Sequence, residues 1–177
     1  MTIIANLGGV CTNYRVQTYT QMRYVGEYWE KQVARYFRKQ GLESERYDQD
    51  WNRIPEPIDL KLYSKFQRDI YVKHPVTGKR LNIEVKSRNQ PFQYNTVDVG
   101  KCSTWDAKRY RVDYLVVVDQ ITGDTRVCQA DELTRSAEWK RRKSNDICYT
   151  VPLGLLGDLD ALIDFWKAQE DIKVLEM

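Results

Sequence analysis

The sequence is poor in the residues that build compact metal-cluster sites. It contains a single histidine, and its four cysteines, Cys11, Cys102, Cys128 and Cys148, are far apart and include no C-x-x-C pair. Structural zinc sites usually bring together closely spaced Cys and His ligands, which this pattern does not provide. We therefore expect the cysteines to be free buried thiols.

Long apolar runs, linkers and repeats are also missing. No run approaches the roughly 18 residues that span a bilayer, and the start "MTIIANLGGV" lacks the basic and long apolar regions of a secretory signal. We expect an intracellular, cytoplasmic protein without a membrane partner. Because no repeat or Gly/Ser linker interrupts the 177 residues, they predict one domain.

Charge is balanced, so only local clusters indicate a partner. The net charge is +3, with 42% hydrophobic and 30% charged residues, as in ordinary soluble domains. The densest basic run, "WKRRK", contains Lys140, Arg141, Arg142 and Lys143, which are candidates for phosphate contact. A charged surface without a ligand is the alternative for this run.

Periodicity predicts helices that alternate with strands. Apolar residues recur at helical spacing from Val25 to Phe37, and Gly41 follows as a stop signal. We expect a polar loop at 43–66 with a short strand near 45–47, and a hairpin at 69–88. A helix then covers 102–110, strands cover 113–119 and 125–130, and an apolar helix covers 158–168. The prediction is an α/β fold with a short mixed sheet flanked by helices, of αβββαβ type.

One face of the hairpin carries acids and an amine. If Lys73 pairs with Arg80, Asp69 lies opposite Glu84, with Cβ atoms about 5 Å apart. Lys86 shares their face because strand side chains alternate, while Leu81, Ile83 and Val85 form the core face. Two carboxylates this close require a proton or a cation between them, and hard oxygen ligands suit Mg²⁺, with Mn²⁺ as a substitute.

This arrangement suits phosphodiester hydrolysis. A metal held by Asp69 and Glu84 would polarise a phosphate and acidify a water, while Lys86 positions that water or stabilises charge. Cross-strand salt bridges on an exposed sheet face are the alternative. Asp59, in "PIDL", is a rival for the first acid. His74 lies at the turn and is expected to be a turn residue rather than a catalytic base.

The pattern resembles the PD-(D/E)XK nuclease superfamily, whose signature is an acid on one strand and E-x-K on the next. Here it reads "RDI" and "EVK", with Arg68 where the family often has proline. Archaeal Holliday-junction resolvases in that superfamily carry G-x-x-x-E-x-x-(I/V)-x-x-x-L-x-x-x-G ahead of E-x-K-S-R. This chain is similar, with Gly26, Glu30, Val33, Phe37 and Gly41 before "EVKSR". The resemblance covers roughly residues 24–133, leaving 1–23 and 134–177 as an N-terminal segment and a C-terminal extension.

The resemblance implies a restriction-endonuclease-like core and further site residues. The Val85 backbone carbonyl and Glu30 would join the metal site. The helical wheel agrees, because Glu30 flanks the apolar stripe whereas Glu27 lies about 60° further round. Arg88 and Lys101 are candidates for DNA contact.

Together these observations predict a Mg²⁺-dependent endonuclease, acting as a homodimer on specific sites in double-stranded DNA, of restriction or homing type. A structure-selective junction resolvase is the first alternative. A non-catalytic nucleic-acid-binding module and an RNA nuclease with the same fold are the others.

Overall fold

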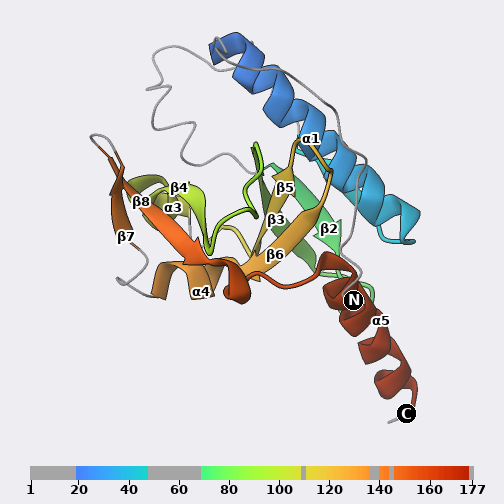
Figure 1. Ribbon diagram of the computed structural model, residues 1–177. Coiled ribbons are helices and arrows are strands. Elements are labelled where there is room, and N and C mark those ends of the chain that lie inside the picture. Colours follow the sequence, from blue (N-terminus) through green and yellow to red (C-terminus); the bar gives the residue numbers. More distant parts are fainter. Residues whose placement is uncertain (1–18, 48–68, 109–110, 136–139, 144–145, 176–177) are drawn as a thin grey trace, which may run out of the picture.

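The computed structural model describes residues 19–47, 69–108, 111–135, 140–143 and 146–175 (Figure 1). Five strands form a sheet in the order β1-β2-β3-β5-β6, and three form a second sheet in the order β4-β8-β7. The elements are α1 (Tyr19–Lys39), β1 (Ser44–Arg46), β2 (Ile70–Lys73), β3 (Arg80–Arg88), β4 (Thr96–Lys101), α3 (Cys102–Lys108), β5 (Tyr114–Asp119), β6 (Thr125–Gln129), α4 (Ala130–Arg135), β7 (Lys140–Lys143), β8 (Asp146–Pro152), η3 (Leu153–Leu155) and α5 (Leu159–Leu175).

The predicted hairpin and its register are confirmed. Strands β2 and β3 are antiparallel, and Lys73 pairs with Arg80. His74 belongs to the turn, where its Nδ1 accepts hydrogen bonds from the backbone N–H groups of Val76 (3.1 Å) and Thr77 (3.2 Å). Because β3 also pairs in parallel with β5, the sheet is mixed, as the predicted α/β class requires.

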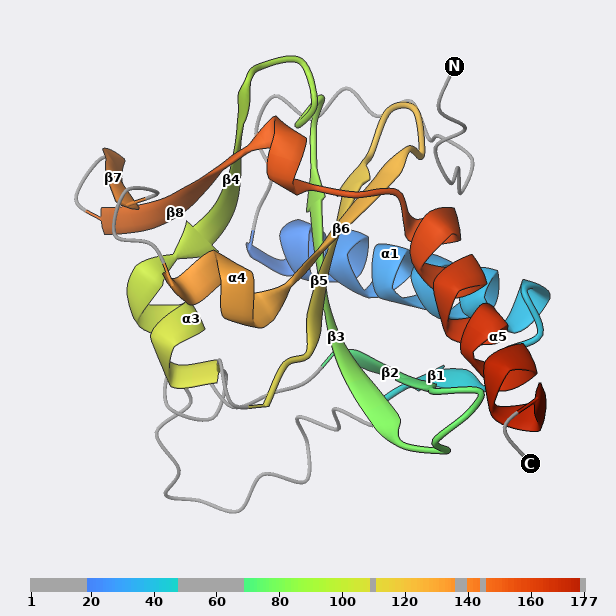
Figure 2. The same ribbon diagram turned by 90° about the horizontal axis from the view of Figure 1, so that it is seen from below.

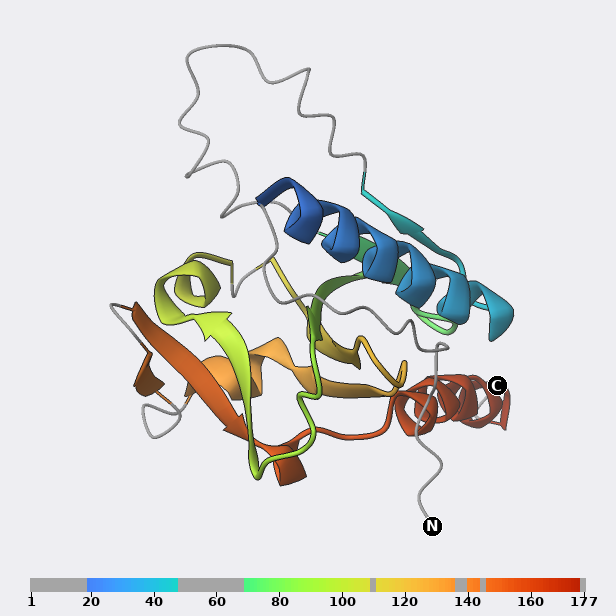
Figure 3. The same cartoon turned by 45° about the horizontal axis from the view of Figure 1, so that its top comes forward.

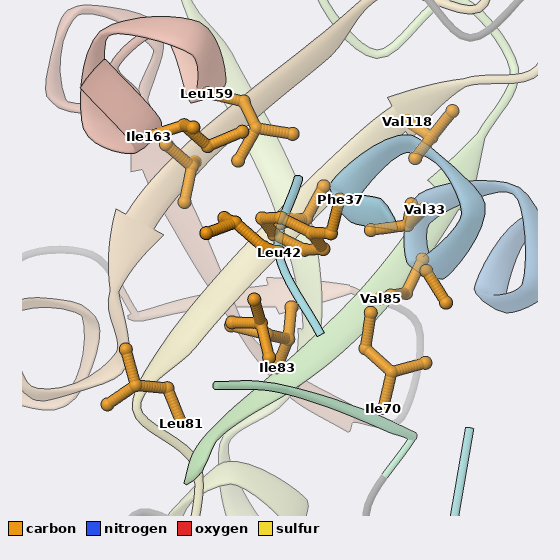
Figure 4. Packing of buried hydrophobic residues seen from close by; sticks show 14 of the residues in the cluster. Val33, Phe37, Leu42, Ile70, Leu81, Ile83, Val85, Val118, Leu159 and Ile163 are labelled. Atoms are coloured by element: carbon orange, nitrogen blue, oxygen red, sulfur yellow. The ribbon is translucent and has the colours of Figure 1, made fainter. Parts of the chain in front are cut away.

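The first hydrophobic core lies between the five-stranded sheet and the helices α1 and α5 (Figures 3 and 4). Helix α1 contributes Trp29, Val33 and Phe37, all at most 2% exposed, so the predicted apolar stripe is the buried face. The sheet contributes the core face of the hairpin, including Ile70 and Ile83. Helix α5 belongs to the same cluster, so the chain beyond residue 133 takes part in this core.

A second core covers the opposite face of the sheet. Alternation along β5 directs Val116 and Val118 to the first core and Leu115 and Val117 to the second. Strands β4 and β8 and helices α3 and α4 complete this second layer, which lies on the other side of the sheet from α1 (Figure 1). The hairpin face that the sequence places apart from the core is therefore covered by a layer whose strands were not predicted.

Three of the cysteines are buried and free, as expected: Cys102, Cys128 and Cys148, whereas position 11 lies outside the described residues. Burial raises the pKa of the Cys128 thiol to about 12, so it stays protonated at neutral pH. No helix in the described ranges has the length and apolar character needed to cross a membrane.

Helix α1 ends at a glycine for a conformational reason. Gly41 has φ +83°, in the left-handed region, and the N–H of Leu42 donates to the Phe37 carbonyl at 3.0 Å. This is the pattern of a Schellman cap, which turns the chain sharply out of the helix. The cap starts the return of the chain toward β1 and the site described below.

Two glycine substitutions on this helix should have effects of opposite sign. A Cβ at either Gly41 or Gly26 would meet no atom within 4 Å, so backbone conformation alone decides the outcome. Gly41→Ala should lower the free energy of unfolding by about 1 kcal/mol because of its positive φ. Gly26→Ala, inside the helix, should raise it by about 0.5 to 1 kcal/mol. Urea unfolding measures both, and equal effects would contradict the assigned helix end.

Candidate functional site

Glu84 lies in the middle of β3 and is almost fully buried. It is 2% exposed, although its neighbours Ile83 and Val85 point into the first core on the other face of the sheet. The Nζ atom of Lys86 lies 3.1 Å from Glu84 Oε1, and 25% of the lysine side chain is exposed. The period of two along the strand therefore produces an ion pair that is closed on the acid side and open on the amine side.

Asp69 precedes β2 and is bound to the backbone next to Glu84. Its Oδ2 accepts a hydrogen bond of 2.8 Å from the N–H of Val85. The N–H and C=O groups of a residue in an antiparallel strand point to the same edge, so the Val85 carbonyl is directed to the side where Asp69 lies. The register and this bond together bring Asp69, Glu84 and the Val85 backbone into one neighbourhood.

Glu30 approaches the same neighbourhood from α1. Its Oε2 accepts a hydrogen bond of 2.8 Å from Arg46 Nε, and its side chain is 12% exposed. Burial raises the pKa of the Glu30 carboxyl above its ordinary value of 4.5; Arg46 opposes the rise, and the charges of Glu84 and Glu27 add to it. The site thus concentrates negative charge from α1 and β3.

The second layer forms a wall beside Lys86. At Gly100, in β4, φ is +112°, and the pairing of β4 with β8 is irregular between Asp98 and Gly100. A Cβ atom at Gly100 would lie 3.9 Å from Lys86 Cε and 3.6 Å from Trp105 Nε1. Trp105 is buried, and its indole N–H donates to the Val99 carbonyl at 2.8 Å. The main chain of β4 thus limits where the lysine can lie.

The other predicted contact residues lie around this centre or outside the described residues. Arg88 is half-buried at the end of β3, where Nη1 donates to the Ser87 carbonyl at 2.9 Å. Lys101 ends β4, next to Gly100, but the description does not extend to its side chain. Lys140, Arg141, Arg142 and Lys143 form β7, which pairs with β8, and their side chains are likewise not described. Asp59 falls in the range 48–68, outside the described residues.

The donor set fits a hard divalent cation in part. Asp69, Glu84 and the Val85 carbonyl offer oxygen ligands of the kind that Mg²⁺ takes, the remainder coming from water or substrate. Within the described ranges, no group of three or more His, Cys, Asp or Glu side chains is arranged to hold a metal. Glu30 is held by Arg46, so it would have to leave that partner to act as a third acid.

Comparisons with known proteins give no family. No family model matches the sequence, and no curated protein matches it. A similar solved structure is that of a nuclease from a fusselovirus, with a TM-score of 0.48 and 12% sequence identity, covering 88% of this chain and 96% of that one. A likeness of this degree does not identify an activity, and the assignment of function depends on the residues of this chain.

The electrostatics of Glu30 predict a stabilising variant. A carboxyl whose pKa is raised on folding holds its proton more tightly in the folded state, so its effect on stability becomes unfavourable as pH rises above 4.5. Glu30→Gln keeps an acceptor for Arg46 and removes the charge. Its Tm at pH 8 should equal or exceed that of the wild type by up to about 4 °C, and the gap should close toward pH 5.

Thermal unfolding at several pH values measures this effect. Glu43→Gln is the matched control, because Glu43 forms an exposed ion pair with Lys73 at 3.6 Å and such pairs contribute little. A clear loss of stability in Glu30→Gln at pH 8 would show that the Arg46 ion pair outweighs burial and repulsion.

Proposed function

We propose that this protein is a Mg²⁺-dependent DNA endonuclease of the PD-(D/E)XK type. The observation that carries the proposal is the burial of Glu84, 2% exposed, in contact with Lys86 and beside the Asp69–Val85 hydrogen bond. Those are the three side chains that the E-x-K pattern and the hairpin register single out.

Burial weighs against a purely structural salt bridge. An ion pair on an exposed sheet face costs little and contributes little, which would account for charges there. Removing a carboxylate from water costs several kcal/mol, and a well-packed apolar residue would serve stability at least as well. Perturbed, enclosed ionisable groups are typical of functional sites. The position of Glu84 between two hydrophobic layers therefore supports a chemical role.

The residues divide the work of hydrolysis. Asp69, Glu84 and the Val85 carbonyl would hold the Mg²⁺ ion, which when bound supplies Lewis-acid activation of phosphate and water. Lys86 donates hydrogen bonds and positive charge where negative charge develops on the phosphate. Gly100 and Trp105 confine its alkyl chain, so that the ammonium group is positioned before substrate arrives.

We further propose that the substrate is double-stranded DNA cut at specific sites by a homodimer, since cutting two strands requires two such sites. Phosphate contacts would come from Arg88, Lys101 and the basic strand β7. The similarity of α1 to the resolvase helix supports a four-way junction as the alternative substrate. An RNA nuclease and a non-catalytic binding module are distinguished from these by the same experiment.

The metal requirement is tested with a panel of substrates. Purified protein is incubated with plasmid, linear duplex, four-way junction, single-stranded DNA and RNA, in Mg²⁺, Mn²⁺, Ca²⁺ or EDTA. We expect discrete duplex fragments in Mg²⁺ and Mn²⁺ and much weaker cleavage in Ca²⁺, whose looser coordination misplaces the water. Cleavage in EDTA would refute the metal site, and cutting only of the junction would establish the resolvase alternative.

Lys86→Ala should reduce the cleavage rate by about 100- to 1000-fold, because it removes a charged donor aimed at the reacting phosphate. DNA binding, measured by anisotropy in Ca²⁺, should be largely retained. Lys73→Ala is the matched control: Lys73 belongs to the same hairpin but is exposed and pairs with Glu43. Circular dichroism verifies folding of both, and a wild-type rate in Lys86→Ala would assign that lysine to structure alone.

A further inference from the structure

The segment between β3 and β4 has an unusual composition for this chain. Residues 89–96, "NQPFQYNT", contain no charged residue, whereas 30% of the whole sequence is charged. Four amide residues are exposed, namely Asn89, Gln90, Gln93 and Asn95, and Tyr94 is 71% exposed. We call this segment the amide loop. Its surface offers neutral donors and acceptors with one aromatic ring.

The amide loop is held firmly by its other residues. Pro91 is buried, and Phe92 packs against the second core with the Arg126 guanidinium 5.3 Å from its ring centroid. The Asn95 carbonyl accepts a hydrogen bond of 2.7 Å from the N–H of Leu153. Gln90 has φ +50°, which places a sharp turn at the start of the loop. The backbone is therefore fixed, and the amide side chains are displayed from a defined frame.

The exposed amides are not required by the fold. Among the residues that the structure describes, none of the four amide side chains forms a hydrogen bond with another residue. Asn and Gln have a side-chain donor and acceptor each, and both groups here are presented to the outside. The loop thus combines a rigid anchor with unused hydrogen-bonding groups, which is how preorganised binding sites are built.

The amide loop is joined to the site at both ends. It begins directly after Arg88, two residues beyond Lys86 on the same face of β3, and it leads into β4, where Gly100 lies beside Lys86. Figure 2 shows the chain leaving β3, turning and returning along β4. A polymer whose phosphate lies at Lys86 would have neighbouring nucleotides within reach of this loop.

The chemistry of the loop fits bases better than phosphates. Phosphate contacts are made mainly by Lys and Arg, which the loop lacks, whereas Asn and Gln form bidentate pairs with the N6 and N7 edge of adenine. We propose that the amide loop reads base edges in the major groove of the cleaved duplex and favours A·T pairs near the cut. This inference rests on the proposed endonuclease function and assigns its sequence specificity.

The test measures base preference rather than total rate. Wild type, the triple variant Asn89→Ala, Gln93→Ala, Asn95→Ala, and the control Gln129→Ala digest a duplex library with randomised positions, and the ends are sequenced. Gln129 is an exposed amide in β6, outside the amide loop. The wild type and the control should prefer A·T pairs near the cut. The triple variant should lose roughly 5- to 150-fold of that preference per base pair read.

Each outcome separates the two proposals. If the wild type cuts no DNA in any metal, the endonuclease function fails and the inference falls with it. If the wild type cuts with A·T preference and the triple variant keeps that preference, the amide loop assignment fails while the function stands. Cleavage without any base preference in the wild type likewise overturns the assignment. An unchanged Tm in the triple variant shows that a lost preference does not come from unfolding.

Discussion

The pair formed by Glu84 and Lys86 is the constraint around which the molecule is organised. Glu84 belongs to β3, the central strand of the five-stranded sheet, and is enclosed although its strand neighbours face the first core. Enclosing a carboxylate requires an amine and backbone donors nearby, because its desolvation is otherwise too costly. Lys86 and the hydrogen bond from Val85 to Asp69 provide these at the point where β2 begins.

Helix α1 links stability to the chemistry of the site. Its buried stripe fixes its rotation over the sheet, and Glu30 at the edge of that stripe is brought close enough to Glu84 for their charges to interact. Repulsion between acids is unfavourable for folding but favourable for recruiting a cation. Arg46 offsets the repulsion in the absence of one. A divalent ion would do so more strongly, so that metal binding and release of Glu30 from Arg46 would be coupled.

Local patterns predicted the part of the fold in which period and pairing are short-range. The helix from 19 to 39, the hairpin register and the buried strand β5 follow from spacing within one segment. The second layer was missed because its strands pair across long separations, β4 with β8, and one of them reads "KRRK". The alternation of Val97 with Val99, and of Tyr149 with Val151, was the available signal. Burial of Glu84 could not be predicted without that layer.

The second layer explains why the site is more than a motif. An acid and an amine two residues apart occur in many strands, and on an open sheet they would be solvated and weakly coupled. Here β4 returns from the amide loop and passes the lysine at Gly100, where the left-handed φ and the absent side chain allow the main chain to come close. The same passage anchors the loop that follows Arg88. Positioning of the ammonium group and display of the amides are therefore two results of one chain path, and a change in that path would alter both.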